Sequence, residues 1–202
     1  MDLQFLMRHF ISGCIPMVAA IALYFLFLHL IGKKQTIGHI ITAFVFCVYL
    51  IGSWSATGVC IRASFSPNIV YIPFVDMIRG PVDTVLNVIL FVPMGFFLPI
   101  LYEKYDELGK VALVGLLLSL SVEMIQLFGF GATDINDLIT NTVGACLGYG
   151  LYKQMSEIIP EEKIQHIRVA GLQCYYELLF FWICSLSLML TIQIYVFRAL
   201  FR

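Results

Sequence analysis

The stretch FGATDINDLITNTVGACLGY, residues 130–149, combines the features that decide the fold. It begins with two carboxylates and an amide, Asp134, Asp137 and Asn141, and the residues after Asn141 are apolar or small. At 3.6 residues per turn, these polar residues share one helical face with a pair of glycines. The members of this polar and glycine stripe are Asp134, Asp137, Asn141, Gly144 and Gly148. The glycine pair follows a small-xxx-small pattern, which predicts that a neighbouring helix approaches closely.

The composition of the chain places this helix in a membrane. Hydrophobic residues make up 60% of the chain, charged residues make up 12%, and the mean hydropathy is +0.92. Spans of about 20 residues would allow about six crossings in a chain of this length. The predicted spans are 10–31, 37–59, 82–101, 111–128, 135–152 and 172–197. The predicted fold class is all-α, a polytopic transmembrane helix bundle.

The positions of lysine and arginine predict the orientation, because these residues in short loops tend to stay on the cytoplasmic side. The loops after spans one, three and five hold seven of them, and the opposite side holds five. The turn at 129–133, after span four, has none. We therefore expect both termini to lie outside, together with this turn and the loop at 62–81.

Spans three and four also carry polar residues at helical spacing. Asp83 and Asn87 stand at i and i+4 in span three, and Glu123 and Gln126 lie in span four. A lipid-facing acid at the bilayer centre costs about 2.5–3.5 kcal/mol, so Glu123 is expected to face protein or water. On the assigned topology these residues and the polar members of the stripe, Asp134, Asp137 and Asn141, lie in the outer halves of spans three to five. One shared polar pocket among these spans follows.

An arginine of the outer loop is a candidate partner for the acids. Asp134 and Asp137 stand about one turn apart on one face, so in a poorly hydrated pocket they resist being ionised together. Arg79 would neutralise them or bind a lipid phosphate. A divalent cation or a shared proton would also offset the charge.

The same residues have structural interpretations. Thr133 or Asp134 would cap the helix, where negative charge offsets the helix dipole. Glu123 and Gln126 would hold helices together by interhelical hydrogen bonds of about 0.6 kcal/mol each. Capping does not explain Asn141, which lies deeper in the helix.

Several classes of function lack their usual signals. The six cysteines fall mostly inside spans without paired spacing, and the four histidines form no ligand spacing, so neither a metal site nor a cofactor is predicted. A divalent cation bound by carboxylates is left open. The chain has no nucleophile elbow, phosphate-binding glycine loop or dinucleotide fingerprint. The net charge of −1 gives no indication of a nucleic-acid partner.

Five short motifs lie between residues 68 and 152. They are NIVYIPF (68–74), NVILFVPMGFFLP (87–99), EMIQ (123–126), GATDINDLITNTVG (131–144) and GY (148–149). Together they resemble the VanZ-like family, which is named for an accessory protein of glycopeptide-resistance clusters. The resemblance implies a multi-pass protein of the bacterial plasma membrane that reduces susceptibility to teicoplanin and related lipoglycopeptides. It also divides the chain into an extra N-terminal transmembrane helix (1–36), a VanZ-like transmembrane core (37–152), and an amphipathic connection with a C-terminal transmembrane helix (153–202).

Two functions fit the predicted pocket. A binding protein would act at the outer leaflet on membrane lipids or a lipid-linked cell-wall precursor, or would hinder membrane anchoring of the lipoglycopeptide antibiotic. An intramembrane enzyme would modify a lipid-linked substrate with Glu and Asp acid–base or metal chemistry. No nucleophile arrangement is recognised, which favours binding and leaves the catalytic residues unassigned. The candidate pocket residues are Arg79, Asp83, Asn87, Glu123, Gln126, Asp134, Asp137 and Asn141.

Overall fold

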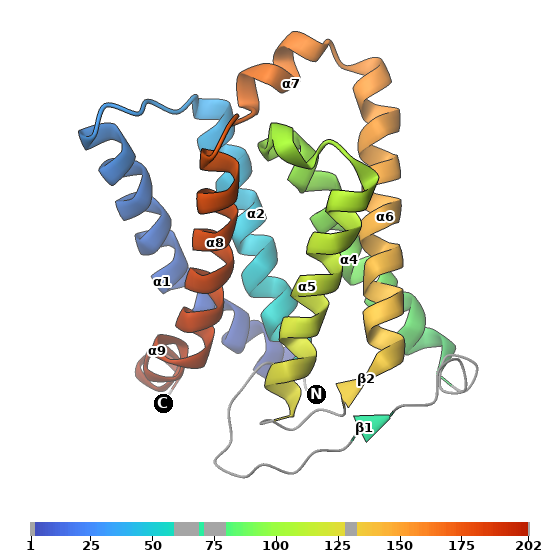
Figure 1. Ribbon diagram of the computed structural model, residues 1–202. Helices are drawn as coiled ribbons and strands as arrows, with labels where there is room; N and C mark the ends of the chain where they lie inside the picture. The colour runs from blue at the N-terminus through green and yellow to red at the C-terminus, as the bar shows by residue number, and fades with distance from the viewer. Residues whose placement is uncertain (1–2, 59–68, 71–79, 128–132, 202) are drawn as a thin grey trace. The chain divides into compact units, whose positions relative to one another are not determined.

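The computed structural model describes residues 3–58, 69–70, 80–127 and 133–201 (Figure 1). These residues are almost entirely helical, which confirms the all-α class. Five helices are long and apolar enough to cross a membrane by length and composition. They are α1 (Leu3–Leu30), α2 (Ile37–Ala56), α4 (Pro81–Leu101), α5 (Leu108–Gln126) and α8 (Gln173–Leu190). Each lies within a few residues of a predicted span, apart from the early start of α1 and the early end of α8.

The structure also differs from the predicted spans at α6 and at α9. The span predicted at 135–152 is α6 (Ile135–Ile158), which is less apolar than the five because of its polar first turns and its charged last turns. Its place in the membrane stays a prediction. The span predicted at 172–197 is two helices, α8 and α9 (Ile192–Leu200). They are separated at Thr191, whose φ of −121° and ψ of −73° are not helical.

Contacts divide the chain into two compact units, 1–59 with 172–202, and 60–171. In the first unit, α1, α2, α8 and α9 pack together. Trp54 Nε1 on α2 donates a hydrogen bond of 3.0 Å to Ser185 Oγ on α8, and Gln193 Nε2 on α9 donates one of 2.9 Å to Ser12 Oγ on α1. Buried polar side chains therefore tie together helices from the two ends of the chain. The predicted division of the chain at 1–36, 37–152 and 153–202 stays a prediction.

In the second unit, α4, α5 and α6 lie side by side (Figure 1). A Cβ atom at Gly144 would overlap the carbonyl oxygen of Val88, and one at Gly148 would overlap that of Val92. Because both pairs advance in the same direction, α4 and α6 run parallel at very short backbone separation. The close approach predicted from the glycine pair is therefore confirmed.

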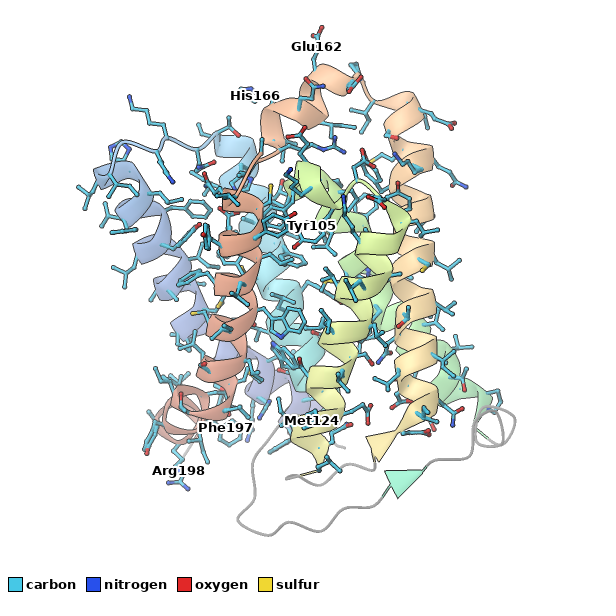
Figure 2. All side chains as sticks on the ribbon, viewed as in Figure 1. Tyr105, Met124, Glu162, His166, Phe197 and Arg198 are labelled. Carbon is cyan, nitrogen blue, oxygen red and sulfur yellow. The ribbon has the colours of Figure 1, made fainter. Side chains whose placement is uncertain are left out.

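Short segments join the helices at both ends of this unit. At one end, β1 (Ile69–Val70) pairs in parallel with β2 (Thr133–Asp134), which brings the segment before α4 to the start of α6. At the other end lie η1 (Glu103–Tyr105) and α7 (Glu161–Ile167). Figure 2 shows Glu162 of α7 at the end of the unit opposite Met124 of α5.

Candidate functional site

The start of α4, the end of α5 and the start of α6 meet at the β1–β2 end of the second unit. Asn87 Nδ2 on α4 donates a hydrogen bond of 2.6 Å to Asp137 Oδ1 on α6. Ser119 Oγ on α5 donates to the Asp137 carbonyl oxygen at 3.4 Å and accepts from Asn141 Nδ2 at 2.8 Å. The polar residues of three helices thus form one continuous network.

Glu123 and Asp134 connect α5 to the first residue of α6. The Glu123 side chain is only 2% exposed, and its Oε2 accepts a hydrogen bond of 2.8 Å from the backbone N–H of Asp134. Glu123 therefore faces protein, which is one of the two environments predicted for it. The Asp134 side chain accepts from the backbone N–H of Asn136 at 2.8 Å, which also confirms its predicted role as helix cap.

Like charges gather at this end of the unit. Asp137 experiences the charges of Asp134 and Asp83, and Glu123 experiences those of Asp137 and Asp134. None of the ion pairs within the described residues reaches Asp83, Asp134 or Asp137. The carboxylates therefore repel one another, and no described cation compensates these three.

The remaining predicted pocket residues lie at the margin of the network or outside the described chain. Asp83 is exposed, one turn before Asn87, and Gln126 is half-buried at the last residue of α5. Arg79 falls outside the described residues, so its approach to Asp134 or Asp137 stays a prediction. The same holds for the turn at 129–132 and for most of the loop at 62–81.

The sequence interpretation missed Asn136 as a member of the site. Asn136 is buried, and its Nδ2 donates to Asp134 Oδ1 at 2.7 Å. The backbone N–H of Asn136 donates to the same oxygen, so two donors of Asn136 hold the capping carboxylate. An asparagine two residues after an aspartate cap was the available signal, because Asp side chains commonly bond the backbone two residues on.

The chemistry of the network is dominated by acceptors. Glu123, Asp134 and Asp137 contribute carboxylates, and the buried Oδ1 of Asn141 receives no hydrogen bond from any described residue. Among the described residues, no group of three or more His, Cys, Asp and Glu side chains is arranged to hold a metal ion. A ligand with several donors and positive charge, such as an ammonium group, matches an acceptor-rich site.

The opposite end of the unit carries basic and acidic side chains together. Asp106, in the loop before α5, pairs with Lys153 Nζ at 2.7 Å and Arg168 Nη2 at 2.9 Å, and it accepts from the Tyr152 hydroxyl at 3.0 Å. Burial raises the pKa of Asp106, but the hydrogen bonds from Lys153, Tyr152 and Arg168 outweigh it and leave the pKa below its usual value. Arg168 Nε also donates to the Pro99 carbonyl oxygen at 2.7 Å. This cluster fixes the segment after α7 to the ends of α4 and α6.

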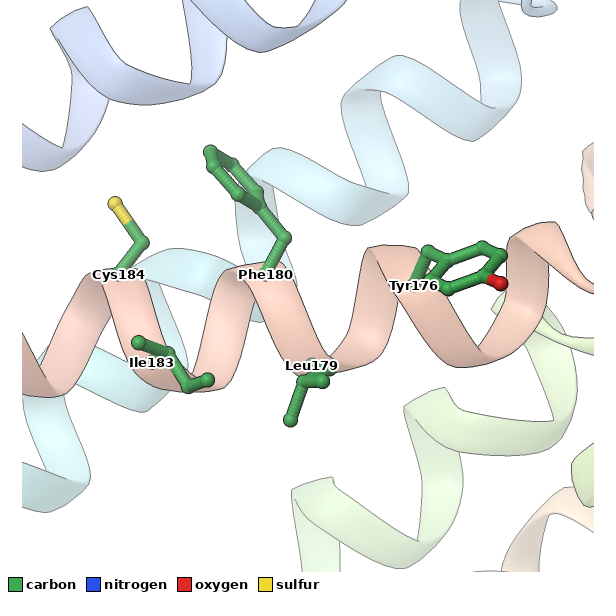
Figure 3. A pocket seen from close by; sticks show the side chains of 5 residues that line it. All are labelled: Tyr176, Leu179, Phe180, Ile183 and Cys184. Carbon is green, nitrogen blue, oxygen red and sulfur yellow. The ribbon is translucent and has the colours of Figure 1, made fainter.

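A groove of about 460 Å³ lies on α8 in the first unit (Figure 3). Its lining side chains follow one face of the helix and are Tyr176, Leu179, Phe180, Ile183 and Cys184. The lining is almost wholly apolar, and the Tyr176 hydroxyl and the Cys184 thiol are its polar groups. In a membrane helix such a face is suited to contact with acyl chains.

The fold and the network define a helical membrane protein with an acidic, amide-containing site at one end of three packed helices. The chain belongs to the VanZ/LLP1 family, whose model matches residues 18–159, more than half of the chain. A relative, Protein VanZ of Enterococcus faecium, is 44% identical over 82 residues, which are 40% of this chain and 50% of the relative. The chain thus matches about half the length of that relative. No solved structure matches the chain.

Proposed function

We propose that this protein reduces the susceptibility of a bacterium to teicoplanin and related lipoglycopeptides by binding a lipid or lipid-linked cell-wall precursor at the outer leaflet of the plasma membrane. The observation that carries the proposal is the convergence of Asn87, Glu123 and Asp137 from three helices. An ionisable residue inside a membrane bundle is costly, and such residues usually mark functional sites. When the site binds a lipid or a lipid-linked precursor, anchoring of the antibiotic in the membrane would be hindered.

The charge distribution of the second unit supports placement at the outer leaflet. Lys104, Lys153 and Arg168 lie at the end with η1 and α7, and the acidic network lies at the other end. Basic residues in short loops favour the cytoplasmic side. The acidic network would then face outward in a multi-pass protein of the plasma membrane.

The acceptor-rich network supports a ligand with a positively charged donor group. An ammonium occurs in ethanolamine headgroups, in amino groups of cell-wall precursors and in amino groups of antibiotics. Arg79 is a cation that the chain itself supplies. Even if Arg79 pairs with one acid, the carboxylates of the network would keep a negative surplus, because Asp83, Glu123, Asp134 and Asp137 together carry more charge than one arginine offsets.

The proposal is tested by measuring teicoplanin susceptibility in a sensitive host that expresses the full chain. Glu123→Leu should remain in the membrane, because leucine inserts more favourably than glutamate, and should abolish resistance. Arg79→Ala should also abolish resistance while the protein level is unchanged. Gln165→Ala, at an exposed position on α7, is the matched control and should keep full resistance. Normal resistance from well-expressed Glu123→Leu would overturn the proposal, and loss of its membrane insertion would show that Glu123 is structural.

An intramembrane enzyme remains the second candidate. The observation in its favour is the electrostatic proximity of Glu123 and Asp137, two ionisable groups of the kind that general acid–base catalysis requires. The exchange of Asp137 for asparagine separates the two functions and is argued in the Discussion.

A further inference from the structure

Helix α9 turns away from α8 at Thr191 and exposes a polar and aromatic face. Figure 1 looks nearly along the axis of α9, whereas α8 runs lengthwise in the same view. A helix that turns away at the end of a membrane-spanning helix is placed to lie along the membrane surface. Its outer face carries Ile194, Tyr195 and Arg198, all of them exposed, and Figure 2 shows the Arg198 side chain pointing away from α8. Tyrosine and arginine are typical of the headgroup level of a bilayer.

The opposite face of α9 packs on the first turns of α1. The buried Gln193 donates its hydrogen bond of 2.9 Å to Ser12 on α1. The Phe197 ring lies 5.8 Å from the Phe5 ring between centroids. These contacts fix α9 to the start of α1 and leave its outer face free for lipid.

Arg8 on α1 stands at the same end of the unit. Its side chain is exposed, and its Cζ lies 5.5 Å from the centroid of the Phe201 ring. Helix α1 has 28 residues, whereas about 20 helical residues cross the hydrocarbon of a bilayer. Counted back from Leu30, the crossing ends near Ile11, which leaves Arg8 at the headgroup level. Arg8 and Arg198 therefore reach the same membrane surface.

No carboxylate of the described first unit is available to these two arginines. Neither α1 nor α9 contains an aspartate or glutamate. Glu177 is the acid that the described part of this unit contains, and it lies in the second turn of α8, where its Oε1 is 2.7 Å from His39 Nε2. None of the ion pairs within the described residues includes Arg8 or Arg198. The surface formed by α9 and the start of α1 is thus positive and aromatic.

We propose that Arg8 and Arg198 form a binding site for anionic phospholipids, which anchors α9 at the membrane surface. A guanidinium binds phosphate through two parallel N–H groups, is weakly hydrated and stacks on aromatic rings. Phospholipid phosphates lie at the headgroup level of both leaflets, so the site is compatible with either orientation of the chain. Its ligand chemistry is opposite to that of the acidic network on α4, α5 and α6. Arg8 and α9 also lie outside the family match at 18–159.

The experiment measures which lipids stay bound to the full chain. The probe is a vesicle of equal parts phosphatidylglycerol and phosphatidylcholine, into which the purified protein is reconstituted. After release into mild detergent, the bound lipids are counted by native mass spectrometry. The wild type should retain phosphatidylglycerol in preference to phosphatidylcholine. Arg8→Gln and Arg198→Gln should each lower the ratio of the two lipids about fivefold, and the double variant should show no preference.

The matched control is Lys34→Gln, which removes the same charge from an exposed position in the loop at the other end of α1. It should change the lipid ratio by less than about twofold. The pair Arg8→Lys with Arg198→Lys should give an intermediate ratio, because lysine keeps the charge without the planar fork. A double glutamine variant with the wild-type ratio would overturn the proposal. So would a loss in Lys34→Gln as large as that in Arg198→Gln, since only the net charge would then count.

Discussion

Asn87 on α4 and Asp137 on α6 are joined by a hydrogen bond of 2.6 Å although 50 residues separate them in the chain. The bond lies about two to three turns from Gly144 and Gly148, whose lack of a side chain lets the two helix backbones touch. The glycine seam therefore sets the distance at which the polar pair can meet. Packing and site geometry are coupled in these two helices.

The exchange of Asp137 separates binding from catalysis. In Asp137→Asn, the new amide oxygen can still accept from Asn87, so the packing of α4 on α6 should persist. A binding site should retain partial teicoplanin resistance, whereas an acid–base catalyst should lose all activity because an amide does not titrate. Asp137→Ala should abolish resistance under either function without removing the protein from the membrane. Full resistance from well-expressed Asp137→Ala would return this aspartate to a role in helix structure.

The glycine seam should tolerate no side chain. Gly148→Ala places a methyl group against the Val92 carbonyl oxygen and should destabilise the second unit by about 1–3 kcal/mol, the usual cost of overpacking. Gly150→Ala is the control on the same helix, because nothing lies within 4 Å of its added Cβ. It should leave the free energy of unfolding unchanged or raise it by up to about 1 kcal/mol. Equal melting temperatures for the two variants would contradict the close approach.

The orientation can be read by labelling introduced cysteines. In a background without the six native cysteines, a cysteine at Ala132 should react with a membrane-impermeant maleimide in intact cells. A cysteine at Glu162, at the end of the second unit that holds Lys153 and Arg168, should react only after the membrane is permeabilised. The reverse pattern would invert the assigned topology and place the acidic network on the cytoplasmic side.

The Asp106 cluster should contribute stability that depends on pH. Since the folded pKa of Asp106 lies below its unfolded value of about 3.9, its stabilisation is fully present above that value and is lost as pH falls through the folded pKa. Asp106→Asn should therefore lower the melting temperature at pH 7, and the difference from wild type should shrink in acid.

The matched control for Asp106 is Glu107→Gln. The exposed pair of Glu107 with Lys110 is screened by water, so this change should shift stability by less than about 1 kcal/mol. A difference between wild type and Asp106→Asn that stays constant from pH 7 into acid would show that the cluster does not titrate as argued.

Properties that depend on local sequence could be predicted. The spans near α2, α4 and α5 followed from hydropathy, because a helix must satisfy its own backbone hydrogen bonds in lipid. The cap at Asp134 followed from the residue types at the helix start, and the inward direction of Glu123 followed from the cost of an acid in lipid. The seam at Gly144 and Gly148 followed from helical spacing. The approach of Arg79 to Asp134 or Asp137 was also expected from the sequence, and it stays a prediction.

The break at Thr191 could not be predicted, because the apolar run continues across it and hydropathy does not record backbone dihedrals. Nor could the pairing of His39 with Glu177, which lie 138 residues apart and have no motif around them. The sequence alone determined that this protein is a bundle of membrane helices and which helix faces are polar. Only the tertiary structure decided which polar faces meet, because side-chain spacing is a property of one helix, whereas a buried ion pair depends on how several helices pack.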